Sequence, residues 1–289
     1  MLEMYKINAS GSAIRLALLL STVLIAMLFP SENARADVKR IFSVGIVPQF
    51  DTRQTYSIWV PIFKELQQRT GYQFELSGSP SIPEFEKQLS AGRFDFAYMN
   101  PYHMQVKHNK QRYVPLAREV ASGLQGILMV KKGGVKSISE LEGKTIAFPA
   151  PNALGASLLM RADLNDKFKL SYHTIYVKSH SSVYLNVLLG LAAAGGGVQK
   201  TLEQQPQHIQ DGLEVIYRTE SFSPHPFAAH PRVPEKIQRE VQQALLELAK
   251  TPQGKALLAE IPIKQLGIAT LEDYQPISSL GLDRFYIQE

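Results

Sequence analysis

Three groups in this chain could bind an anion without covalent chemistry: a loop of small residues, a run of hydroxyls and an imidazole. The loop from Pro151 to Ser157 follows the apolar run Thr145–Phe148 and precedes a helical pattern. A helix start there would present free backbone N–H groups and a positive dipole end to an oxyanion. Asn152, Gly155, Ala156 and Ser157 are the binding candidates. The alternative is an ordinary strand-to-helix turn that satisfies its own cap.

The hydroxyls and the imidazole lie in a second loop, Ser179-His180-Ser181-Ser182. A neutral or protonated histidine can donate a hydrogen bond to an anion. We therefore take His180, Ser181 and Ser182 as binding candidates. Two simpler interpretations stay open, since serine is a preferred helix N-cap and a lone loop histidine is commonly solvent-exposed.

Two further loops follow strand-like runs. Pro48-Gln49-Phe50 contributes Phe50, and Asn100-Pro101-Tyr102 contributes Asn100 and Tyr102 as candidates. Asn-Pro is also a common turn, and Tyr102 could equally pack in the core. Trp59 falls on the apolar stripe of a helical pattern over 56–68, which favours a packing role.

Catalytic and metal-binding motifs are missing from the sequence. The run Gly195–Thr201 has the wrong spacing for a phosphate loop, and neither His-Glu-x-x-His nor Gly-x-Ser-x-Gly occurs. Cysteine is absent, and the basic residues are scattered rather than clustered, which argues against nucleic-acid binding. We therefore expect no enzyme activity, no metal and no cofactor.

The elements that position these loops alternate between strand and helix. About nine strand patterns are separated by helical ones, which predicts an α/β fold with mainly parallel sheets. So many strands favour two lobes rather than one sheet. Ala192–Gly197 is a small-residue segment before a helix expected over 198–204. Ligands of such sheets bind beyond the carboxyl ends of the strands, where the candidate loops lie.

The N-terminus has the parts of an export signal. Lys6 and Arg15 precede a short apolar run, and Ala34-Arg35-Ala36 follows it. This pattern predicts a signal peptide over residues 1–36, cleaved near Ala36, and a periplasmic protein. An uncleaved membrane anchor is the alternative. The formal charge of +5, from 31 basic and 26 acidic residues in 289, would at most help to steer an anion.

The motifs in their order resemble a known family. They are Gly45–Pro48, Ala91–Tyr102, Leu141–Phe148, Pro151-Asn152 and Ser179–Val183 with Gly190. The set resembles the periplasmic substrate-binding proteins of phosphate, phosphite and phosphonate ABC transporters, the PhnD-like family. The resemblance covers nearly all of the chain after the signal.

This resemblance implies a two-lobed type II periplasmic binding protein fold with an interlobe ligand cleft and two hinge crossings. Lobe 1 would be residues 37–124 plus 220–289, and lobe 2 residues 125–219. The chain would cross near 123–126 and 219–226. By analogy, Tyr102 and His180 would contact the ligand, with Ser181 and Ser182 at the start of the same helix.

The sequence departs from the family pattern at two points. The hydroxyl-rich helix start of the family is here Ala153-Leu154-Gly155-Ala156-Ser157, and His225 stands where some relatives have an aspartate. A histidine there would suit an anion or line the hinge. Each lost hydrogen bond to a charged ligand would cost roughly 1.5–3 kcal/mol.

We therefore expect a monomeric protein that captures a small oxyanion, of phosphonate, phosphite or phosphate type, for an inner-membrane ABC permease. Two alternatives remain from the sequence. The same fold could present its liganded form to a membrane sensor protein, or the chain could be an exported hydrolase.

Overall fold

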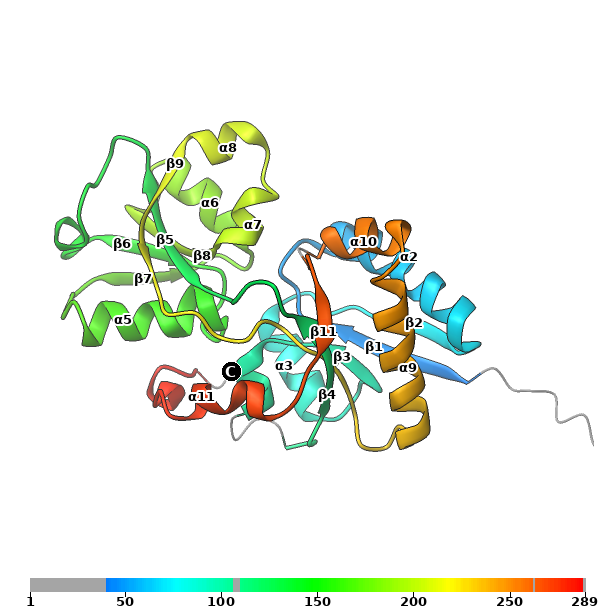
Figure 1. Cartoon of the computed structure of the whole chain (residues 1–289). Coiled ribbons are helices and arrows are strands. Elements are labelled where there is room, and N and C mark those ends of the chain that lie inside the picture. The colour runs from blue at the N-terminus through cyan, green and yellow to red at the C-terminus, as the bar shows by residue number, and fades with distance from the viewer. Residues whose placement is uncertain (1–39, 106–109, 262, 288–289) are drawn as a thin grey trace, which may run out of the picture. The chain divides into compact units, whose positions relative to one another are not determined.

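The computed structural model describes residues 40–105, 110–261 and 263–287 (Figure 1). The predicted signal peptide, residues 1–36, lies outside the described residues. Helices pack around two separate sheets, which confirms the expected α/β class.

In the described part of the chain, six strands form the first sheet in the order β11-β4-β10-β3-β1-β2. Their bounds are β1 Ile41–Ile46, β2 Gln73–Ser77, β3 Phe96–Tyr98, β4 Val114–Glu119, β10 Phe227–Ala229 and β11 Leu266–Ile268. The helices between and after these strands are α2 Thr52–Thr70, α3 Ile82–Ser90, α4 Pro101–Gln105, α9 Glu235–Leu248, α10 Pro252–Ala259, η3 Glu272–Tyr274, α11 Gln275–Ser278 and η4 Leu282–Arg284.

Helix α2 shows how local sequence sets these elements. It begins after Asp51, whose side chain accepts a hydrogen bond from the Gln54 N–H, and ends at Gly71 with φ of 75°. Its apolar stripe is buried, and Trp59 packs against Tyr98 and Phe227 in the core, as the helical spacing predicted.

Five other strands within the described ranges form the second sheet, in the order β7-β6-β8-β5-β9. Their bounds are β5 Gly126–Lys131, β6 Thr145–Phe148, β7 His173–Tyr176, β8 Ala194–Val198 and β9 Leu213–Arg218. The helices are η1 Ile138–Leu141, η2 Leu154–Leu159, α5 Met160–Asp166, α6 His180–Leu188, α7 Gln199–Glu203 and α8 Gln207–Asp211. One core lies under α6, α7 and α8, and another under η1 and α5 (Figure 1).

The expectation of mainly parallel sheets is wrong. β1 pairs in parallel with β2 and β3, and β6 with β7 and β8, but the remaining pairings are antiparallel. The cause is that the chain leaves the first sheet after β4 and returns as β10, which is antiparallel to β3. The two connecting segments also pair with each other, through Leu124 and Phe222 and through Gly126 and Thr219.

The sequence predicted no strand over the small-residue segment 192–197. Its residues Ala194–Val198 form β8, in the middle of the second sheet. A Cβ placed at Gly196 would come within 2.0 Å of the Ala156 carbonyl oxygen, and one at Gly126 of β5 within 2.0 Å of the Gly155 carbonyl oxygen. Because Gly126 of β5 and Gly196 of β8 have no side chain, the backbone of η2 can lie directly on the sheet.

This contact predicts that Gly196→Ala destabilises the chain strongly. Overpacking of this kind costs about 1–3 kcal/mol or more, since the contact is with a backbone atom that cannot rotate away. Gly78→Ala is the matched control, because its added Cβ would meet the nearest atom, the Tyr56 hydroxyl, at 3.4 Å. Urea denaturation measures both, and equal stability of the two variants would contradict the proposed packing of η2.

Candidate functional site

Five of the predicted site residues come together around one small cavity. Asn100, Gly155, Ala156, His180 and His225 line it, together with apolar residues and Gln49. Its volume is about 20 Å³, which is room for about one water molecule. Residues of the predicted binding loops thus lie close together around it.

The start of η2 forms one wall of this cavity. The segment Leu154–Leu159 is a π-helical turn, in which the Ser157 and Leu158 N–H groups both donate to the Ala153 carbonyl at 2.8 and 3.0 Å. Ser157 is fully buried, and its Oγ has no hydrogen-bond partner among the described atoms. It does not line the cavity, whereas Ala153, Leu154, Gly155 and Ala156 of this segment do.

His180 forms another wall and is uncharged. It is the first residue of α6, it is 3% exposed, and its Nδ1 lies 3.3 Å from the Thr201 Oγ1. Burial lowers its pKa from 6.5 to about 4. At neutral pH this side chain would contact an anion through a hydrogen bond and not through a charge.

The serines beside His180 serve the helix. Ser179 is the N-cap of α6: its Oγ accepts from the Ser182 N–H at 3.1 Å and bonds the Ser182 Oγ at 2.9 Å. Ser181 and Ser182 are half-buried, and neither lines the small cavity. This is the capping arrangement that the sequence left open as an alternative.

Asn100 and Asn152 belong to a buried polar network. Asn100 Nδ2 donates to the Asn152 carbonyl at 2.8 Å, and Asn152 Nδ2 donates to Glu86 Oε2 at 2.9 Å. The other Glu86 oxygen lies 2.8 Å from His103 Nε2. Asn152 also makes two hydrogen bonds with the backbone of Ile287. Its Nδ2 donates to the Ile287 carbonyl, and its Oδ1 accepts from the Ile287 N–H. The network therefore ties β3, α3, the loop after β6 and the C-terminal segment together.

Tyr102 is part of the packing around that C-terminal segment. It is 1% exposed, its hydroxyl donates to Asp283 Oδ1 at 3.0 Å, and its ring stacks on Tyr286. Arg161 holds the same segment from α5, donating to the Phe285 carbonyl at 2.5 Å. Tyr102 lies away from the small cavity in this conformation.

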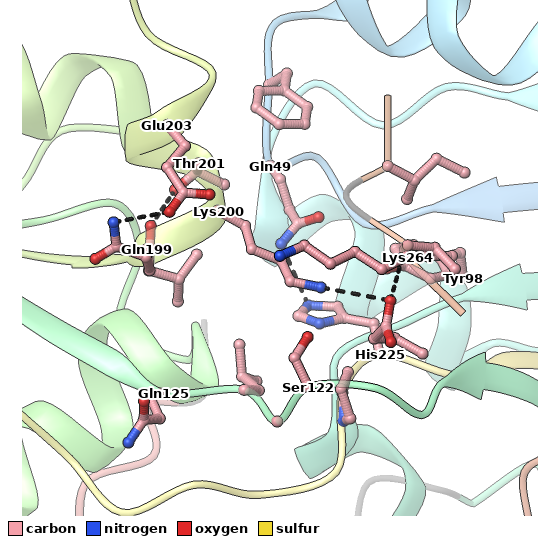
Figure 2. Close-up of a pocket in the computed structure, with 18 of the residues that line it drawn as sticks. Gln49, Tyr98, Ser122, Gln125, Gln199, Lys200, Thr201, Glu203, His225 and Lys264 are labelled. Carbon is pink, nitrogen blue, oxygen red and sulfur yellow. Dashed lines mark hydrogen bonds and ion pairs between the residues drawn. The ribbon is translucent and has the colours of Figure 1, made fainter. Parts of the chain in front are cut away.

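A larger cavity of about 240 Å³ adjoins the small one and shares Gln49, Leu124, Val198 and His225 with it. Phe50 lines the larger cavity and not the small one. His225 stacks on Tyr98 with ring centroids 5.4 Å apart, and its ring lies 3.5 Å from the Gln49 amide (Figure 2). Burial, together with nearby positive groups, lowers the pKa of His225 to about 3. Both cavity histidines are therefore neutral.

The charged groups of the larger cavity were missed at the sequence level. Lys200 from α7, Lys264 before β11 and Glu119 at the end of β4 all line it (Figure 2). Lys200 Nζ lies 3.8 Å from Glu119 Oε2, so this ion pair joins a helix of the second sheet to a strand of the first. The sequence indicated a helix around Lys200, but no feature of the sequence indicated that Lys200 would pair with Glu119.

The described ranges contain no group of three or more histidine and acidic side chains placed to hold a metal ion. Among the same residues, no helix has the length and apolar character needed to cross a bilayer.

The lowered pKa of His180 predicts a pH dependence of stability. Between pH 6.5 and about 4 the unfolded chain binds a proton that the folded histidine does not, so the free energy of unfolding falls as pH falls. His180→Asn should remove up to about 3 kcal/mol of that fall. His208→Asn, at an exposed position on α8, is the control. Denaturation at several pH values measures this, and identical pH profiles for the two variants would contradict a neutral, buried His180.

The network predicts that Asn152→Ala lowers the free energy of unfolding by about 2–4 kcal/mol, because Glu86 and the Ile287 backbone lose buried partners. Asn165→Ala, at an exposed position of the neighbouring α5, should change it by less than about 0.5 kcal/mol. Chemical denaturation compares the two. A small loss for Asn152→Ala would show that the network does not hold the C-terminal segment.

Comparisons with known proteins agree on the fold. Three solved structures align over most of this chain. A binding protein component of an ABC phosphonate transporter from Pseudomonas aeruginosa has a TM-score of 0.78 and 16% identity, over 86% of this chain and 88% of that one. PhnD1 from Prochlorococcus marinus, in complex with methylphosphonate, has a TM-score of 0.75 and 15% identity, over 86% and 100%. A Xanthomonas citri protein bound to ATP has a TM-score of 0.68 and 14% identity, over 85% and 98%.

These likenesses show the two-lobed type II periplasmic binding protein fold that the sequence motifs predicted. A search of curated protein sequences gave no match. The model of one family, the periplasmic substrate-binding proteins of phosphonate ABC transporters, matches residues 44–274. Since this match spans most of the chain, the protein belongs to that family.

Proposed function

We propose that this binding protein captures a phosphorus oxyanion, of phosphonate, phosphite or phosphate type, and delivers it to an ABC permease in the inner membrane. The observation that carries the proposal is the family match over residues 44–274. The structural likeness to PhnD1 in complex with methylphosphonate adds support for the ligand class.

The candidate groups around the small cavity suit a small oxyanion. Backbone N–H groups at Gly155 and Ala156, the Asn100 amide and the neutral His180 ring supply hydrogen bonds. A cavity of about 20 Å³ is too small for such an anion, so binding requires the loops to move apart. Ser157, Ser181, Ser182, Asn152 and Tyr102 would join the site only after such a movement.

The movement would be a hinge between two lobes, residues 37–124 with 220–289 and residues 125–219. Strand membership supports this division, because β5–β9 form the second sheet and the other described strands form the first. The paired segments at Leu124 and Phe222 are the natural hinge, since the chain passes from one sheet to the other in both of them.

The same proposal places the mature protein in the periplasm as a monomer, after cleavage of the signal near Ala36. Membership of a periplasmic family supports export. The basic start, short apolar run and Ala-x-Ala site of residues 1–36 support a cleavable signal.

A thermal-shift and calorimetric screen tests the ligand class. Phosphate, phosphite, methylphosphonate and phenylphosphonate are titrated, with sulfate and citrate as controls. A ligand at a hundred times its Kd should stabilise the protein by about 2.7 kcal/mol. We expect at least one phosphorus oxyanion to do so. Stabilisation by none of the four would contradict the proposed ligand class.

A further inference from the structure

The last residues that the structure describes, 281–287, form a strap whose first contacts are with the part of the chain that carries the first sheet. Leu282 is buried in the core cluster around that sheet. The Tyr102 hydroxyl of α4 donates to Asp283 Oδ1 at 3.0 Å, and the Tyr102 ring stacks on the Tyr286 ring with centroids 5.8 Å apart. We call residues 281–287 the C-terminal strap.

The other side of the strap contacts the part of the chain that carries the second sheet. Arg161 of α5 donates to the Phe285 carbonyl at 2.5 Å. Asn152, in the loop after β6, donates through Nδ2 to the Ile287 carbonyl at 2.8 Å and accepts from the Ile287 N–H through Oδ1 at 3.0 Å. Besides the two segments in which the chain passes from one sheet to the other, the strap is therefore a further, non-covalent connection between the two parts.

The side chains that hold the strap are buried. Asn152 is 1% exposed and Arg161 is 8% exposed. Arg161 Nη2 also donates to the Pro151 carbonyl at 2.8 Å, so one guanidinium joins the strap to the loop after β6. Release of the strap takes buried donors away from their acceptors, which costs more free energy than the loss of an exposed pair. The ion pair between Arg284 and Asp166 is more exposed and contributes little.

The loop that the strap holds leads directly into a wall of the small cavity. Asn152 is followed by Ala153 and by the start of η2, whose residues 154–156 line the cavity together with Asn100. The Asn152 carbonyl accepts from Asn100 Nδ2 at 2.8 Å, and Asn152 Nδ2 donates to Glu86 Oε2 at 2.9 Å. The strap thus fixes the loop that keeps η2 close to Asn100. The resulting volume of about 20 Å³ admits about one water molecule and no phosphorus oxyanion.

We propose that the C-terminal strap is an autoinhibitory contact. While Asn152 and Arg161 hold the strap, η2 stays close to Asn100 and the cavity stays too small for an anion, so the strap must be released before a ligand enters. The competition between the strap and the anion rests on the proposed function. The control of the separation of the two sheets by the strap does not rest on it and can be measured without a ligand.

The separation of the two sheets in the ligand-free protein is the first measurement. Because the chain has no cysteine, Lys132→Cys and Lys236→Cys introduce one spin label on each part, at exposed positions after β5 and on α9. In this labelled protein, Arg161→Met and Ile287→Pro should broaden the distribution of label distances and lengthen its mean. The first variant removes the guanidinium that binds the strap, and the second removes the N–H from which Asn152 accepts.

Two matched variants serve as controls and should keep the wild-type distribution of distances. Arg53→Met makes the same substitution at an exposed position of α2, and Ile287→Ala removes the side chain but keeps the N–H. Thermal unfolding checks that each variant folds. Ile287 has an exposed side chain, so its two variants keep the test decisive even if Arg161→Met fails to fold.

Isothermal titration with methylphosphonate and inorganic phosphate is the second measurement. The apparent affinity is the intrinsic affinity reduced by the fraction of molecules that are competent to bind. Arg161→Met and Ile287→Pro raise that fraction, so they should bind about fivefold or more tightly than the wild type, and the two controls should bind as the wild type does.

The outcomes separate the strap from the proposed function. Wild-type distances in both strap variants would overturn the strap. Longer distances with unchanged or weaker binding would overturn the autoinhibition, because the ligand would then bind the strapped form at least as well. Longer distances with no binding of either anion by any variant would overturn the autoinhibition together with the proposed ligand class, and would leave the control of sheet separation by the strap standing.

Discussion

The backbone of η2 lies directly against strands β5 and β8, at Gly126 and Gly196. Gly155 and Ala156 of η2 line the small cavity, together with His180. The residues of η2 that line it carry no polar side chain. The position of η2 thus determines how this side of the second sheet is packed. It also determines which groups of η2 line the small cavity.

The site separates charge from hydrogen bonding. The two histidines that line the small cavity are neutral, because burial lowers the pKa of both, and nearby positive groups lower that of His225 further. The ammonium groups lie in the adjoining larger cavity, beside a carboxylate fixed by backbone N–H groups.

The sequence predicted the α/β fold class and the buried Trp59, since each follows from a local pattern. It missed β10 and β11, which are too short to show alternation, and β8, whose glycines suit a close backbone approach and not a strand pattern. The loops lining the small cavity followed from their places after strands. Lys200, Glu119 and Lys264 could not be found, because only the folded chain brings them together.

A crystal structure of the protein with methylphosphonate bound is the most direct test of the proposed site. We expect the phosphorus oxyanion within hydrogen-bond distance of the Gly155 and Ala156 N–H groups, the Asn100 amide or the His180 ring. Density for the ligand away from all of these groups would contradict the proposal.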